Sequence, residues 1–175
     1  QTGEGAMDEI SNILVRMKEL AQQSATGTVG DTERAYLDAE YTALTAEIDR
    51  IAAATEFNGV QLLDGTGGAV DIQVGISTNA FDQVAIDLSG AMDSATLTVA
   101  TGVDTAANAL LAMDEIDVAI AAVSANRGDF GALQNRLESS IRNLGTTMEN
   151  LAAANSRIRD VDVAKETASM TSFQI

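Results

Sequence analysis

The sequence predicts a mainly α-helical protein, an elongated bundle of long helices with a small antiparallel β-hairpin patch. Apolar residues recur at threes and fours over residues 3–24, 31–56 and 104–159, which is the spacing of one helix face. Over residues 58–100 they alternate instead, as in half-buried strands. We therefore expect one rod domain over residues 1–159. Residues 160–175 are expected to be a connector and the start of a truncated C-terminal helix.

Two apolar stripes define the first two helices. The first stripe contains Met7, Ile10, Ile13, Leu14, Met17, Leu20 and Ala21. A small polar run with two glycines follows, and Asp31 is expected to cap the next helix. The second stripe is a heptad seam made of Leu37, Tyr41, Leu44, Ile48, Ile51 and Thr55. Two such helices joined by a short loop form a hairpin that requires a third partner.

The β patch starts where the helical period ends, at Phe57-Asn58-Gly59. Alternating apolar residues then occupy four short segments: Val60 and Leu62; residues 70–76; residues 84–88; and Leu97 and Val99. Glycine-containing and small polar turns separate most of them. This pattern predicts three or four antiparallel strands, too few for a separate domain.

The third helix is predicted to be the longest. Its stripe contains Ala106, Leu110, Met113, Ile116, Ile120 and Val123, and continues through Phe130, Leu133, Leu137, Ile141, Leu144, Met148, Leu151 and Ile158. We expect this face to be a buried seam, in which Leu137→Ala or Leu144→Ala costs about 2–5 kcal/mol. Glycines at 128 and 131 cost about 1 kcal/mol each in a helix interior, which a well-packed bundle tolerates. The apolar stripe also keeps the same face on both sides of these glycines. We therefore favour one continuous helix over a break near Asn126.

Composition excludes several classes of function. The chain has no Cys, His, Trp or Pro, so it lacks the thiol nucleophile, the commonest general base and the commonest metal ligand. Its carboxylates are dispersed, and we expect no enzyme activity, no cofactor and no metal site. The net charge of −16 disfavours binding to nucleic acid or an anionic membrane, because both require basic patches.

Three stretches resemble bacterial flagellin. They are residues 5–21, which contain Gly5-Ala6-Met7-Asp8-Glu9-Ile10 and Arg16-Met17-Lys18-Glu19-Leu20-Ala21; residues 47–59, which end in Glu56-Phe57-Asn58-Gly59; and residues 131–160, which begin Gly131-Ala132-Leu133-Gln134-Asn135-Arg136-Leu137. Together these stretches cover most of the chain, and they follow one another in the same order as in flagellins. The absence of Cys and the scarcity of aromatic residues also suit a family whose subunits are exported unfolded through a narrow channel.

The resemblance implies a structural subunit of the extracellular flagellar filament that is secreted and self-assembles for motility. Its implied partners are other filament subunits and the flagellar export and capping machinery. A hook–filament junction protein, or a cell-surface adhesin or receptor built on the same rod, is the alternative. Flagellins are also recognised by an innate immune receptor of the host, and the matching positions here are Arg16, Leu20 and Glu40.

The resemblance also implies terminal helices before Gln1 and after Ile175 that form the innermost tube of the filament. Residues 1–175 alone are therefore expected to be monomeric. Little room remains for the outer domains that flagellins insert after the β patch.

Overall fold

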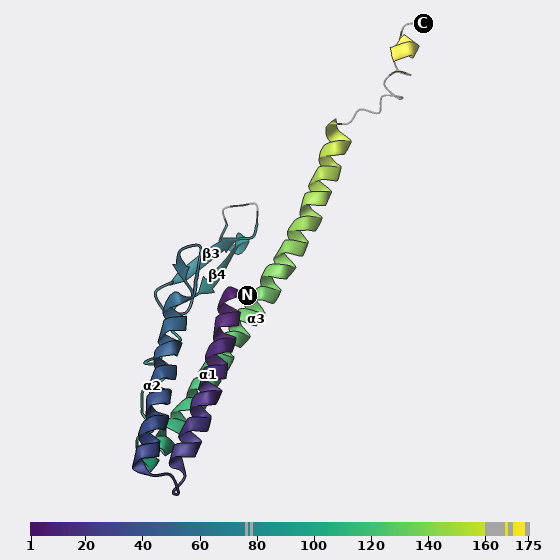
Figure 1. The fold of residues 1–175 in the computed structure, drawn as a ribbon. Helices are drawn as coiled ribbons and strands as arrows, with labels where there is room; N and C mark the ends of the chain where they lie inside the picture. The colour runs from purple at the N-terminus through teal and green to yellow at the C-terminus, as the bar shows by residue number, and fades with distance from the viewer. Residues whose placement is uncertain (76, 78, 160–166, 168–169, 174–175) are drawn as a thin grey trace. The chain divides into compact units, whose positions relative to one another are not determined.

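A computed structural model describes residues 1–75, 77, 79–159, 167 and 170–173 (Figure 1). Within these residues the elements are the helices α1 (Thr2–Ala25), α2 (Asp31–Ala54) and α3 (Ala106–Arg159), the strands β1 (Glu56–Phe57), β2 (Val60–Gln61), β3 (Ala69–Gln73) and β4 (Gln83–Asp87), and a 3₁₀ turn at Ala80–Asp82. The predicted fold class, mainly α with small antiparallel strand pairs, is confirmed. The chain forms two compact units, residues 1–72 with 84–134, and residues 73–83 with 135–175.

The first unit is built on the hairpin of α1 and α2, which lie side by side (Figure 1). All seven residues of the predicted α1 stripe are buried in its core. From the α2 seam, Tyr41, Ile48 and Ile51 are buried, and Leu37 and Leu44 pack against the core. Both ends of α2 differ from the prediction. Asp31 is the first residue of α2 and Gly30 precedes it as the N-cap, while α2 ends at Ala54 because Thr55 is extended.

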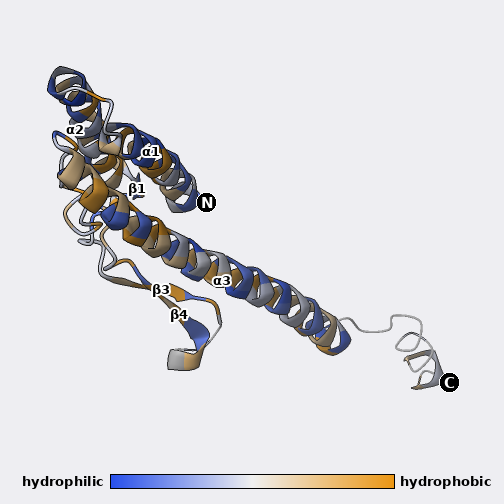
Figure 2. Ribbon diagram, turned by 90° about the horizontal axis from the view of Figure 1, so that it is seen from below, coloured by the Kyte–Doolittle hydropathy of each residue, from blue (hydrophilic) through white to orange (hydrophobic). Residues whose placement is uncertain are grey.

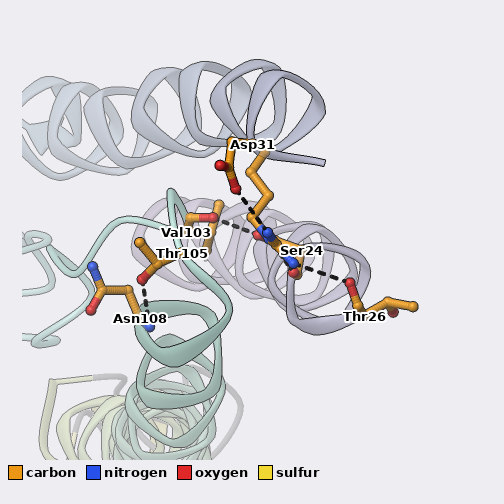
Figure 3. A network of polar contacts seen from close by, with 7 residues as sticks. Ser24, Thr26, Asp31, Val103, Thr105 and Asn108 are labelled. Carbon is orange, nitrogen blue, oxygen red and sulfur yellow. Dashed lines mark hydrogen bonds and ion pairs between the residues drawn. The ribbon is translucent and has the colours of Figure 1, made fainter. Parts of the chain in front are cut away.

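The ends of all three helices meet around Ser24, which is fully buried near the C-terminus of α1 (Figure 3). Its hydroxyl donates to the carbonyl oxygen of Val103, 2.5 Å away, just before α3. Its own carbonyl accepts a hydrogen bond from Nε of Arg34, in the first turn of α2, at 3.0 Å. The α3 helix then starts with a side-chain cap, because the hydroxyl of Thr105 accepts from the backbone N–H of Asn108.

Replacement of Ser24 by alanine is expected to destabilise the first unit by about 1–3 kcal/mol, because the buried carbonyl of Val103 loses its donor. Urea unfolding followed by circular dichroism measures this change. The control is Thr26→Ala, since the exposed Thr26 hydroxyl bonds only within the same helix end and its loss should stay within about 0.5 kcal/mol. Equal midpoints for the two variants would contradict the role given to Ser24.

The segment from Met92 to Val103 is not the fourth strand that the alternation of Leu97 and Val99 predicted. Both side chains are buried, but the backbone makes turns, with Thr98 at φ 56°. Side chains of α2 hold this segment in place of strand partners. Asp49 accepts from the backbone N–H and the hydroxyl of Ser94, at 2.8 and 3.0 Å.

Two further α2 side chains hold the end of the same segment. Asp38 accepts a 2.6 Å hydrogen bond from the N–H of Val103. The Tyr41 hydroxyl donates to the carbonyl oxygen of Val99 at 3.3 Å. Burial, followed by the charges of Glu115 and Asp38, raises the pKa of Tyr41 to about 12. The backbone of this segment is thus satisfied partly by backbone turns within it and partly by side chains of α2, and a residue pattern alone does not reveal the second set.

The face of α3 that is buried in the first unit matches the predicted one in part: Ile116 and Val123 are buried, and Met113 and Ile120 pack against the core. The buried residues are Ala109, Ala112, Ile116, Ala119 and Val123, whereas the predicted Leu110 is 58% exposed. Leu111 and Val118 are exposed as well. Small residues allow helices to approach closely, so three alanines occupy this contact together with Ile116 and Val123, whereas Leu110 lies outside it. Phe130 packs against this core, with one ring carbon 3.3 Å from where a Cβ on the buried Gly3 would stand.

The predicted buried seam over residues 137–158 is wrong for the described chain. Ile141, Met148, Leu151 and Ile158 are all more than half exposed, and Leu137 and Leu144 are partly exposed. Apolar spacing fixes which residues share a helix face, but burial requires a partner for that face. In the hydropathy colouring, apolar residues recur among polar ones along this half of α3 (Figure 2).

α3 runs without a break through both glycines. A Cβ on Gly128 would meet nothing within 4 Å, so Gly128→Ala is expected to stabilise the protein by about 0.5–1 kcal/mol through lower backbone entropy in the unfolded chain. Thermal unfolding tests this. Gly67→Ala should instead destabilise, since its Cβ would lie 2.2 Å from the carbonyl oxygen of Gln61. A melting temperature that falls for Gly128→Ala would contradict this prediction.

The strands form two separate two-stranded sheets, β1 with β2 and β3 with β4. In the first, Phe57 pairs with Val60 in an antiparallel register. Hydrogen bonds from Leu88 N to Gly68 O and from Val74 N to Asp82 O flank the second pair. The predicted strand residue Ile76, and the predicted connector at 160–175 except for residues 167 and 170–173, lie outside the described residues.

Candidate interaction surface

The described residues hold no group of three or more His, Cys, Asp or Glu side chains arranged to bind a metal ion. Among the helices of the same residues, none is both long enough and apolar enough to cross a membrane. The exposed surfaces of the described helices carry large apolar side chains.

The most prominent such surface is an apolar stripe on the second half of α3. We call Ile141, Met148, Leu151 and Ile158 the α3 stripe; their side chains are 66%, 68%, 53% and 84% exposed. Spacings of seven, three and seven residues place them on one side of the helix. Large apolar side chains grouped on one exposed helix face are typical of a protein interaction site.

Charge distinguishes this part of α3 from the rest of the protein. Residues 135–159 carry Arg136, Arg142, Arg157 and Arg159 against Glu138 and Glu149. Residues 1–134 instead carry twenty-one acidic side chains and only five basic ones. The α3 stripe therefore lies on a basic helix segment of a strongly acidic chain.

Ion pairs connect the three helices of the first unit. Arg16 of α1 bonds Glu40 of α2 at 2.7 Å. The pairs Lys18–Asp117 and Arg127–Asp8 connect α1 to α3. Each pair joins α1 to a helix that runs antiparallel to it, and the exposure of these side chains limits the contribution of the pairs to stability.

Of the three residues predicted to contact the immune receptor, the structure brings Arg16 and Glu40 together as an ion pair and buries Leu20. Arg16 and Glu40 are exposed, and hydrogen bonds to Glu40 and then Glu19 raise the pKa of the Arg16 guanidinium above its ordinary value. Leu20 is only 1% exposed and lies in the core. In this conformation only the two charged residues offer a contact surface.

Sequence reasoning did not identify the exposed aromatic residues Tyr36, Phe57 and Phe81 as surface features. Phe81 is 98% exposed in the turn between β3 and β4. Phe81 lies before Asp82, between the two segments of alternating apolar residues at 70–76 and 84–88. That position in the sequence could have indicated an exposed turn.

Comparison with known proteins identifies relatives over the whole chain. The family profile described as bacterial flagellin N-terminal helical region matches residues 1–67, and that described as bacterial flagellin C-terminal helical region matches residues 113–175. A flagellin of Halalkalibacterium halodurans is 45% identical over all of this chain, which spans 64% of that protein. Flagellin of Bacillus subtilis is 39% identical over all of this chain and 68% of the relative.

A solved structure agrees with the sequence comparison. The crystal structure of Bacillus cereus flagellin matches with a TM-score of 0.73 and 37% identity, over 87% of this chain and 88% of the other. The long helices, with an N-terminal and a C-terminal helical region on either side of small antiparallel strand pairs, define a mainly helical fold of the flagellin type. The chain belongs to the bacterial flagellin family. It spans a little under two thirds of the length of several of its relatives.

Proposed function

We propose that this chain is the helical segment of a structural subunit of the bacterial flagellar filament, and that it associates with copies of itself. The observation that carries the proposal is the α3 stripe, which lies within the region matched by the C-terminal flagellin profile. Burying a large apolar side chain contributes about 1.5–3 kcal/mol, so four of them supply a substantial driving force for association.

Charge complementarity supports the same function. The arginine-rich segment 135–159 of one subunit is suited to lie against the acidic first unit of another, so contact neutralises part of the net charge of −16. Association of this kind is sensitive to ionic strength, because salt screens exposed charges beyond about 10 Å at 0.1 M.

The further parts of the proposal follow from family membership. The subunit is secreted, reaches the extracellular filament through the flagellar export machinery and is assembled with the capping machinery. It has no enzymatic role and needs no cofactor. A hook–filament junction protein or an adhesin is not favoured, because flagellins align with the whole chain. For the immune receptor of the host, we propose Arg16 and Glu40 as the contacts, with Leu20 as a core residue beneath them.

A chimaera tests the proposed function. The segment of Bacillus subtilis flagellin that aligns with this chain is replaced by residues 1–175, and filaments are examined by electron microscopy and swimming assays. The test variant combines Ile141→Gln, Met148→Gln and Leu151→Gln, and the matched control is Asn143→Gln on the polar side of the same helix. We expect filaments from the parent and the control, and none from the triple variant.

Circular dichroism and gel filtration of the purified subunit accompany the assay. A folded, monomeric triple variant that forms no filaments supports intersubunit contact through the α3 stripe. Normal filaments from it would contradict the proposal. Loss of the variant's helicity would assign the stripe to packing within the subunit and would equally contradict it.

A further inference from the structure

The turn between β1 and β2 consists of Asn58 and Gly59, both in left-handed conformations with φ of 53° and 78°. With Phe57 paired to Val60, this is a two-residue hairpin whose turn needs positive φ at both central positions. Asn and Gly are the residues that best tolerate this conformation. The same pair brings an amide side chain next to a backbone nitrogen that no side chain shields.

The surroundings of this turn are open. Both residues are exposed, and a Cβ placed on Gly59 would meet no atom within 4 Å. In the described part of the chain, no hydrogen bond engages the side-chain amide of Asn58. Because Gly59 has no side chain, its own atoms leave its backbone nitrogen uncovered.

We propose that Asn58 is a site of spontaneous deamidation. The backbone nitrogen of Gly59, on losing its proton to solvent base, attacks Cγ of Asn58. A new C–N bond forms, the Cγ–Nδ2 bond breaks, and ammonia leaves with a proton from solvent, which gives a five-membered succinimide. Water then opens the ring at either carbonyl and yields aspartate or isoaspartate. No oxidant or cofactor takes part.

The two products have different structural consequences. Aspartate keeps the backbone of the turn and adds one negative charge to an already acidic chain. Isoaspartate adds a methylene to the main chain inside a two-residue turn, so the pairing of Phe57 with Val60 cannot persist. The hydrogen bond from Leu62 N to Thr55 O, at 3.0 Å, closes the other end of this hairpin. We expect it to be lost after the pairing of Phe57 with Val60.

Incubation of the whole chain at physiological temperature and mildly alkaline pH tests the proposal. Peptide mapping by mass spectrometry follows the mass gain caused by replacing NH2 with OH, and fragmentation distinguishes isoaspartate from aspartate. We expect the peptide with Asn58 to gain this mass first. Asn12 and Asn143, which are also exposed but lie in helices before large apolar residues, serve as internal controls.

The variant Asn58→Gly keeps a residue that favours the left-handed turn but has no amide to lose, so its peptide should show no mass gain. Circular dichroism before incubation verifies that this variant is folded. Deamidation of Asn58 no faster than that of Asn12 or Asn143 would overturn the proposal. So would an Asn58 that stays intact in the folded chain while it reacts in urea, because the turn would then be protective.

Discussion

Replacement of Leu14 by alanine is expected to lower the free energy of unfolding by about 2–5 kcal/mol. Leu14 is fully buried in the core of the first unit, and truncation removes apolar contacts and leaves a cavity. Urea unfolding followed by tyrosine fluorescence measures the effect, because Tyr41 lies in the same core and the chain has no Trp.

The matched control for this prediction is Leu151→Ala. It removes the same atoms from a side chain that is 53% exposed on α3, so the change should remain within about 0.5 kcal/mol. Leu137→Ala and Leu144→Ala should fall between the two, below the cost that the sequence predicted for them, because both side chains are partly exposed. Equal losses for Leu14→Ala and Leu151→Ala would show that the buried face has been assigned wrongly.

Alkaline pH is expected to destabilise the first unit through Tyr41. In the unfolded chain a tyrosine ordinarily loses its proton near pH 10, whereas burial raises the pKa of Tyr41 in the folded chain to about 12. The neutral phenol is therefore favoured by the folded state. The associated stability is fully present below about pH 10 and is lost as pH rises toward about 12, at up to about 1.4 kcal/mol per pH unit.

Unfolding free energies measured across this window test the alkaline effect. Tyr41→Phe should be less stable at neutral pH, because it loses the 3.3 Å hydrogen bond to Val99, but its stability should decline less steeply above about pH 10. Tyr36→Phe, at an exposed position on the same helix, is the control and should keep the parental slope. Identical slopes for the parent and Tyr41→Phe would contradict the role given to Tyr41.

The candidate surface could be predicted only in part. The sequence assigned Ile141, Met148, Leu151 and Ile158 to one helix face, but it predicted that face as a buried seam. The resemblance to flagellin likewise indicated Arg16, Leu20 and Glu40 as receptor contacts. The structure then showed the ion pair between Arg16 and Glu40 and the burial of Leu20. Which side of an amphipathic helix meets a neighbour depends on residues far away in the chain.

Local spacing and short motifs were enough to predict the three long helices, the small antiparallel β patch and membership of a helical filament-protein family. The packing of the helices decided that Ala109 and Ala112, and not Leu110, lie at the contact of α3, since close approach of helices selects small side chains that carry no strong pattern. It also decided that Asp38 and Asp49 hold the segment before α3, because a backbone group can be satisfied by any suitable side chain that folding brings near it.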